Sequence, residues 1–179
     1  LVAFQVEDWN RDFSPWKASA VFGKEDFAGQ GAKTLKWLTE ECVPYIDRTF
    51  GAKDREHWLM GYSLAGLFAL WTAYENDAFS GIICCSGSLW FPEWDHYMRE
   101  HMLRSKCSVY LSLGGKEEKT RNKIMAAVGD RTRAQEERLE EDSMVESVVL
   151  EWNAGGHFAD AGKRLAKGVR WMFGAKNGL

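Results

Sequence analysis

Residues 56–70 read EHWLMGYSLAGLFAL, and the turn at their centre decides the fold. A short apolar run, residues 57–60, leads to Ser63, which lies between Gly61 and Ala65, and an apolar stretch of helical composition follows. This order is typical of a nucleophile elbow, in which a strand turns sharply into a helix and holds the serine in a strained conformation. A serine that caps a buried helix is the plainer interpretation, and the motif by itself leaves both open.

The elbow also predicts where a developing negative charge would be bound. It presents the Ser63 hydroxyl beside the first free N–H groups of the following helix. The N–H of Leu64, the residue after the serine, is therefore the predicted oxyanion donor. The strict pattern has glycine at position 65, and Ala65 departs from it by a single methyl group, which the turn is expected to tolerate.

Two later strands supply a candidate base. Residues 107–113 (CSVYLSL) have the composition of a buried strand and run into GGKEE, and residues 145–152 (VESVVLEW) form another strand that ends in NAGGHF. Ligands bind at the carboxyl ends of the strands in an open α/β sheet, so both loops are expected at one edge. Among the four histidines only His157 follows a strand in this way, and it is the predicted base.

The predicted acid is one of two adjacent glutamates, Glu117 and Glu118. Counting from Gly114, the first glycine after the strand, a G-x-x-acid turn selects Glu117. The segment KEEKTRNK is also typical of a solvated charge run, and this alternative weighs more on Glu118 than on Glu117. Glu117 is the predicted acid, and Glu118 stays open as the alternative.

Strands and helices alternate along the whole chain. The expected strands are residues 1–6, 57–60, 79–86, 107–113 and 145–152. The expected helices fall within residues 29–50, 64–74, 122–141 and 159–173, with a short one in the loop that ends at residue 104. This alternation predicts an α/β fold, a mostly parallel sheet with helices on both faces. No repeat or linker marks a boundary, so residues 1–179 are expected to form a single domain.

Composition excludes several classes of function. The 179 residues are 45% hydrophobic and 27% charged, as is ordinary for a globular domain. A net charge of −3 without a concentrated basic face argues against a nucleic-acid partner. No apolar run is long enough to span a membrane, and no signal peptide is visible, so a cytoplasmic protein without a membrane partner is expected.

The four cysteines do not have the spacing of a metal site. Cys84 and Cys85 are neighbours in one strand, and Cys42 and Cys107 fall in a helix and at a strand start. They are expected to be buried free thiols. No metal or organic cofactor is predicted.

Tryptophans give the best indication of the substrate. The chain has nine, and four of them cluster in the segments EDWNRDFSPW and GSLWFPEW, which are expected to meet above Ser63. Such a pocket would favour a small substrate with an aromatic or flat apolar group. Tryptophans that fill gaps under long loops are an equally weighted alternative. The predicted pocket residues are Tyr62, Trp9, Trp16, Trp90 and Trp94.

Four segments in combination resemble one branch of the α/β-hydrolases. They are GYSLAG (61–66), CCSGSLWFPEW (84–94), LSLGGKEEKTRN (111–122) and GGHF (155–158). The resemblance extends over about residues 1–173 and is to the esterase branch that includes esterase-D-like enzymes and enterochelin (siderophore) esterases. It implies a serine hydrolase acting on a small-molecule carboxylic ester, with Ser63 as nucleophile, Glu117 as acid and His157 as base. A non-catalytic hydrolase-fold module that binds a ligand or partner is the alternative.

The resemblance also implies that strands are missing from this sequence. In α/β-hydrolases the second oxyanion N–H comes from the loop after the third strand. Residues 1–6 match the fourth strand of such a sheet, so the first three have no counterpart. The chain is therefore expected to be a carboxyl-terminal portion, with the missing N-terminal strands either outside the given sequence or supplied by a second chain or segment.

Overall fold

The computed structural model describes residues 1–177, which fall into two compact units. The first unit is Leu1–Glu56 and the second begins at His57. All residues of the elbow, and both loops that follow the later strands, belong to the second unit. Each unit is described by itself.

The first unit is built around one long helical stretch. It contains α1 (Trp9–Asp12), the short antiparallel pair β1 (Lys17–Ala18) and β2 (Phe27–Ala28), α2 (Gly31–Trp37), a π-helical turn (Leu38–Cys42) and α3 (Val43–Phe50). The helix expected within residues 29–50 is thus present, with a π-helical turn that ends two residues before Pro44. Proline cannot donate the regular backbone hydrogen bond, and the wider turn accommodates it. Gly51 ends the stretch at a φ of 62°.

The strand expected at residues 1–6 is not formed. These residues have no regular secondary structure and no strand partner within the described chain. Their composition favours an extended segment, but a strand exists only when its backbone pairs with a neighbour. The expectation that this segment is part of the sheet is therefore wrong for the described residues.

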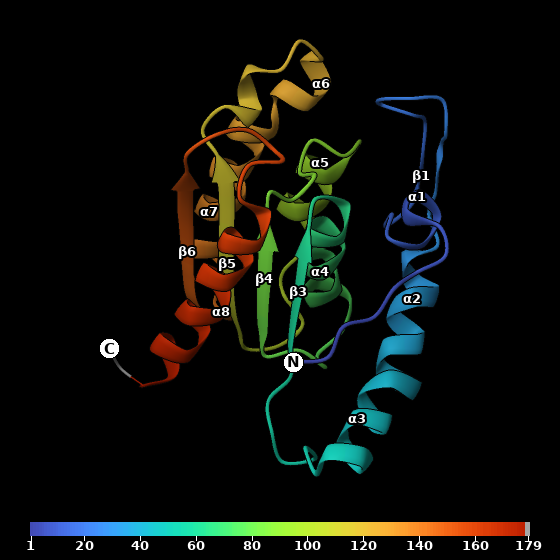
Figure 1. Ribbon diagram of the computed structural model, residues 1–179, viewed down its shortest axis with the longest axis vertical. Coiled ribbons are helices and arrows are strands. Elements are labelled where there is room, and N and C mark those ends of the chain that lie inside the picture. The colour runs from blue at the N-terminus through green and yellow to red at the C-terminus, as the bar shows by residue number, and fades with distance from the viewer. Residues whose placement is uncertain (178–179) are drawn as a thin grey trace. The chain divides into compact units, whose positions relative to one another are not determined.

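The second unit contains a parallel sheet in the order β3-β4-β5-β6 (Figure 1). Its strands are β3 (Trp58–Tyr62), β4 (Gly81–Cys85), β5 (Cys107–Gly114) and β6 (Val145–Asn153). Every residue of β4 and β5 is buried, as in a sheet covered on both faces. Within the described residues, β3 pairs only with β4, so the expectation of further strands beyond β3 stays a prediction.

Helices cover both faces of this sheet, which confirms the predicted α/β class. They are α4 (Leu64–Glu75), α5 (Trp94–Glu100), the 3₁₀ turn Glu117–Lys119, α6 (Lys123–Ala126), α7 (Val128–Glu140) and α8 (Ala161–Asn177). In Figure 1 α8 lies over one face, and α4 and α7 lie over the other. The single charged helix expected at 122–141 is divided in two at Ala127.

Close approach of α8 to the sheet fixes where its first turns lie. A Cβ atom at Gly168 would lie 2.5 Å from Ile83 and 3.0 Å from Tyr110, so only glycine permits this contact. Arg164 is four residues earlier and therefore lies one turn closer to the carboxyl ends of the strands. The packing of α8 thus places the Arg164 side chain at the edge of the sheet where the predicted site residues lie.

Cys42, Cys84, Cys85 and Cys107 are all free, and all but Cys42 are buried. Burial raises the pKa of the Cys85 thiol to about 11, which keeps it protonated. Among the described residues, no helix has the length and apolar character needed to cross a membrane.

Candidate active site

Ser63 sits at a strained turn between β3 and α4. Its φ is 59° and its ψ is −126°, a conformation that residues with a side chain rarely adopt. A Cβ atom at Gly61 would lie 2.0 Å from the carbonyl oxygen of Ala65, so the turn requires glycine there. Ala65 itself is partly exposed, which leaves room for its methyl group.

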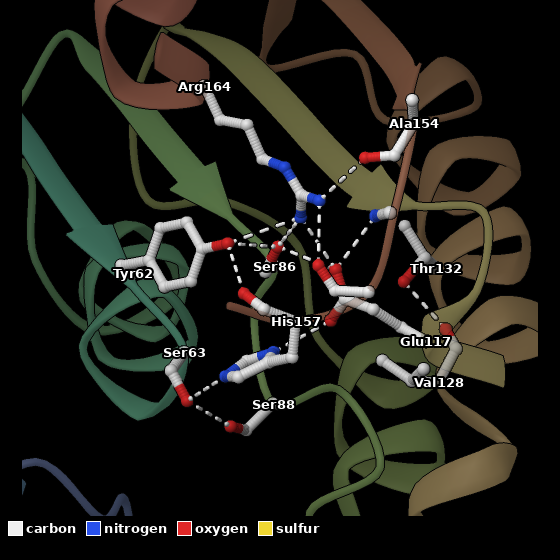
Figure 2. Close-up of polar contacts among 12 residues, drawn as sticks. Tyr62, Ser63, Ser86, Ser88, Glu117, Val128, Thr132, Ala154, His157 and Arg164 are labelled. Carbon is white, nitrogen blue, oxygen red and sulfur yellow. Dashed lines mark hydrogen bonds and ion pairs between the residues drawn. The ribbon is translucent and has the colours of Figure 1, made fainter. Parts of the chain in front are cut away.

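The capping interpretation of Ser63 is not supported. Ser63 occupies the position before α4, yet its side chain makes no capping hydrogen bond. Its hydroxyl instead lies 3.0 Å from Nε2 of His157 and 3.5 Å from the hydroxyl of Ser88 (Figure 2). The strained turn therefore aims the hydroxyl at a histidine rather than at its own helix.

His157 links Ser63 to a buried carboxylate. Its Nδ1 lies 2.7 Å from Oε2 of Glu117. A carboxylate can only accept hydrogen bonds, so Nδ1 carries the hydrogen and Nε2 is left to accept from the serine. The side chain of His157 is 28% exposed and that of Glu117 only 4%, so the ring faces solvent while its carboxylate partner is enclosed.

The two candidate glutamates have different partners. Glu117 lies in the 3₁₀ turn after β5 and reaches His157, as the turn count predicts. Glu118 points away and forms an ion pair with Arg133 of α7, with 2.9 Å between Oε2 and the guanidinium. The structure thus brings Glu117, and not Glu118, to the histidine.

The second oxygen of Glu117 is held by three donors. Oε1 accepts from the Gly114 N–H at 2.7 Å, the Ser86 hydroxyl at 2.8 Å and the Arg164 guanidinium at 2.8 Å. Burial alone would raise the pKa of this carboxyl. The hydrogen bonds from His157, Gly114 and Ser86 outweigh burial and hold the pKa below its ordinary value. Glu117 is therefore a carboxylate at neutral pH.

The lowered pKa of Glu117 predicts a stability difference at acid pH. Its folded pKa lies below the unfolded value of about 4.3, so its contribution is fully present above that value and is lost as the pH falls through the folded pKa. We expect the free energy of unfolding of the wild type to fall more steeply below about pH 4.3 than that of Glu117→Gln. Denaturant titrations across this range measure the difference, and parallel curves would contradict it.

The predicted oxyanion donor lies at the start of α4. Leu64 is the first residue of that helix, so its N–H has no acceptor within the helix. It follows Ser63 directly in the chain. The N–H of Leu64 is the one oxyanion donor predicted within this sequence, and the identity of the second donor stays open.

Three polar residues at the site were not predicted from the sequence. Arg164 lies in the helix expected within residues 159–173, where nothing singled it out, yet it is 1% exposed and contacts Glu117. Ser86 and Ser88 follow β4 and are buried beside Glu117 and Ser63 respectively. The serines could have been found from their place after a strand, but nothing local marks Arg164.

The predicted pocket residues of the second unit, Tyr62, Trp90 and Trp94, have different surroundings. Tyr62 is at the site, but its hydroxyl donates to the carbonyl oxygen of His157 at 2.6 Å. Trp90 is buried in the loop after β4. Trp94 is completely buried, and its indole N–H donates to Gln135 at 3.0 Å, so its assignment to the pocket is wrong. It fills the core beneath a long loop, which was the alternative for these tryptophans.

The other two tryptophans belong to the first unit. Trp9 is half exposed and packs edge-on against Phe13, and Trp16 is partly buried. Their meeting with Ser63 stays a prediction.

Phe158 is an aromatic residue at the site that was not predicted. It directly follows His157, its ring centroid lies 5.0 Å from that of the imidazole, and the two rings are nearly perpendicular. Its side chain is 93% exposed. A large apolar surface thus adjoins the histidine on its solvent side.

The arrangement has the parts needed for acyl transfer. A hydroxyl, an imidazole and a carboxylate follow one another at hydrogen-bonding distance, beside a free helix N–H. Within residues 1–177, no group of three or more histidine, cysteine, aspartate or glutamate side chains is placed to hold a metal ion.

Solved structures share this fold at low sequence identity. A siderophore hydrolase from Aspergillus nidulans (EstA) has a TM-score of 0.73 at 17% identity, over 92% of this chain and 65% of its own. An IroE-like serine hydrolase from Shewanella oneidensis has a TM-score of 0.75 at 17% identity, over 91% and 56%. The BES protein from Bacillus cereus has a TM-score of 0.68 at 21% identity, over 94% and 66%. This chain thus spans about two thirds or less of each of these proteins.

The comparison of sequences identifies a family. No curated protein matches the chain. The model of the esterase family, described as "Putative esterase", matches residues 1–172. Since this match extends over nearly the whole sequence, the chain belongs to that esterase family.

Proposed function

We propose that this protein is a serine hydrolase that cleaves carboxylic esters through an acyl-enzyme on Ser63. The observation that carries the proposal is the unbroken chain of hydrogen bonds from the Ser63 hydroxyl through His157 to Glu117 (Figure 2). The serine sits at a strained turn, and its hydroxyl is not used for capping. Membership of the esterase family supports the same reaction class.

In the first step Ser63 Oγ attacks the ester carbonyl carbon, and the C=O electron pair moves onto the oxygen. Nε2 of His157 takes the hydroxyl proton, and Glu117 stabilises the imidazolium that results. The N–H of Leu64 donates to the oxyanion. When the intermediate collapses, the ester C–O bond breaks, and the imidazolium gives its proton to the departing alkoxide.

In the second step water repeats the sequence on the acyl-enzyme. His157 takes one proton from the water as its oxygen attacks, and the Ser63–acyl bond breaks with return of the proton to Ser63. The sum is ester and water converted to acid and alcohol. The residues need no metal or organic cofactor for any of these transfers.

The substrate we propose is a small ester with an aromatic or apolar group. Phe158 supports this choice because its exposed ring lies against His157, where one side of a bound ester must lie. A panel of aryl and alkyl esters of equal acyl length tests it, and the panel includes a siderophore ester because siderophore hydrolases are among the proteins with a similar fold. We expect higher kcat/KM for the aryl members, and the reverse ranking would refute the substrate proposal alone.

A fluorophosphonate probe tests for an activated serine without knowledge of the substrate. Attack by Ser63 on phosphorus displaces fluoride, and His157 takes the hydroxyl proton. We expect covalent labelling of the wild type and none of Ser63→Ala. Ser143→Ala is the matched control, because Ser143 is exposed in the turn before β6, at the opposite end of the sheet. Labelling that survives in Ser63→Ala would contradict the proposal, and a wild type that resists the probe would favour a binding module.

A further inference from the structure

A buried arginine connects the carboxylate of the site to the loop that carries the histidine. Arg164 is on α8, its side chain is 1% exposed, and in the view of Figure 2 it lies above Glu117 and His157 with its guanidinium directed toward them. Placing a guanidinium in the core is costly unless its donors are satisfied and its charge is paired. The hydrogen-bond partners of Arg164 therefore indicate its role in the site.

One guanidinium nitrogen of Arg164 donates hydrogen bonds to Glu117 and its neighbour Ser86. Nη1 donates to Oε1 of Glu117 at 2.8 Å and to the hydroxyl of Ser86 at 2.7 Å, and Ser86 in turn donates to the same carboxylate oxygen. These contacts leave Oε2 free for the imidazole. The carboxylate is thus fixed on one side so that its other side can orient His157.

The other terminal nitrogen donates hydrogen bonds to the loop after β6, which carries His157. Nη2 donates to the carbonyl oxygens of Ala154, at 3.2 Å, and Gly156, at 2.9 Å, which precede His157 in the chain. Tyr62 holds the same loop from the other side, because its hydroxyl donates to the His157 carbonyl at 2.6 Å and accepts from Nη1 at 3.2 Å. A planar fork can reach both sets of acceptors at once, whereas an ammonium group cannot.

Not every donor of this side chain is used. The Nε–H of Arg164 is buried and has no hydrogen-bond partner among the described residues. An orphaned donor in the core costs stability, so stability alone is a poor reason for placing an arginine here.

We infer that Arg164 is a positioning residue, which locks the Glu117 carboxylate and the His157 loop together so that Nε2 stays on the Ser63 hydroxyl. It acts through Glu117 and His157 and does not contact the substrate. The inference deepens the proposed function and rests on it for its kinetic test. Small displacements of a catalytic group cost about 10²-fold in rate, which sets the size of the expected effect.

The kinetic test replaces Arg164 by methionine and by lysine in the full-length protein. We expect Arg164→Met to lower kcat by about 10²-fold with little change in KM, and Arg164→Lys to fall between it and the wild type. Arg170→Met is the matched control, since Arg170 is exposed on the same helix and should leave kcat unchanged. Should Arg164→Met not fold, the lysine variant carries the same test. Normal kcat in both variants would overturn the inference.

A double-mutant cycle separates positioning from a general loss of structure. If Arg164 acts through the triad, adding Arg164→Met to Glu117→Gln should lower kcat little beyond Glu117→Gln alone. Losses that multiply would show that Arg164 acts independently and would contradict the inference.

A spectroscopic readout does not depend on turnover. In ¹⁵N-histidine NMR spectra, His157 of the wild type should be in the Nδ1–H form, with its proton shifted far downfield by the bond to Glu117. Arg164→Met should weaken that signature and mix the two tautomers, while Arg170→Met should not. If the wild type has no esterase activity but Arg164→Met still changes the His157 signature, the positioning role stands and the proposed function is wrong. An unchanged signature would reject the positioning role itself.

Discussion

Replacing Ser63 by alanine is expected to lower kcat for ester hydrolysis by on the order of 10⁴-fold or more. The Ser63 hydroxyl forms the acyl bond in the proposed mechanism, and the triad residues act as a unit. The fold should be retained, because alanine differs by one oxygen, keeps the same backbone strain and removes no capping bond. Steady-state kinetics measure the loss, and thermal melting confirms that the variant is folded.

Ser88→Ala is the informative comparison for this result. Ser88 lies 3.5 Å from the nucleophile, but in the proposed mechanism it forms no bond to the substrate. Ser88→Ala should therefore lower kcat far less than Ser63→Ala does. If Ser63→Ala retained most of the activity, the nucleophile assignment would be wrong.

Glu117→Gln is expected to lower kcat by about 10⁴-fold, the second largest effect. The amide can donate to Nδ1 of His157, which would favour the tautomer that cannot accept the serine proton. It also leaves the Arg164 guanidinium without its carboxylate partner. The measurement is kcat at neutral pH, with melting curves to record any loss of stability.

Glu118→Gln is the matched control for the acid, because it makes the same chemical change one residue away. Its carboxylate faces Arg133 rather than His157, so kcat should remain close to that of the wild type. A variant Glu118→Gln that lost as much activity as Glu117→Gln would contradict the assignment. Normal activity in both would mean that the histidine works without this acid.

The parts of the site set by local chemistry were predictable from the sequence. The elbow could be predicted because its turn has room only for small residues beside Ser63, and a short sequence motif is enough to show them. His157 and Glu117 were found because strand ends in a parallel sheet share one edge. The distinction between Glu117 and Glu118 followed from a count along one turn.

The parts set by distant packing were not predictable. Arg164 has no distinguishing pattern around it in the sequence, and its burial depends on how closely Gly168 lets α8 approach the sheet. Trp94 was misassigned because its partner Gln135 is 41 residues away. Residues 1–6 were expected to be a strand from composition alone, while a strand requires a pairing partner that sequence does not reveal.

The most direct test of the central claim is to trap the acyl-enzyme and locate it. The protein is mixed with an aryl ester such as p-nitrophenyl acetate, quenched in acid during the first turnovers, digested and analysed by mass spectrometry. The account predicts the acyl mass on the peptide that contains Ser63, with no acyl peptide formed by Ser63→Ala. An acyl group found on another residue, or full hydrolysis by Ser63→Ala, would contradict it.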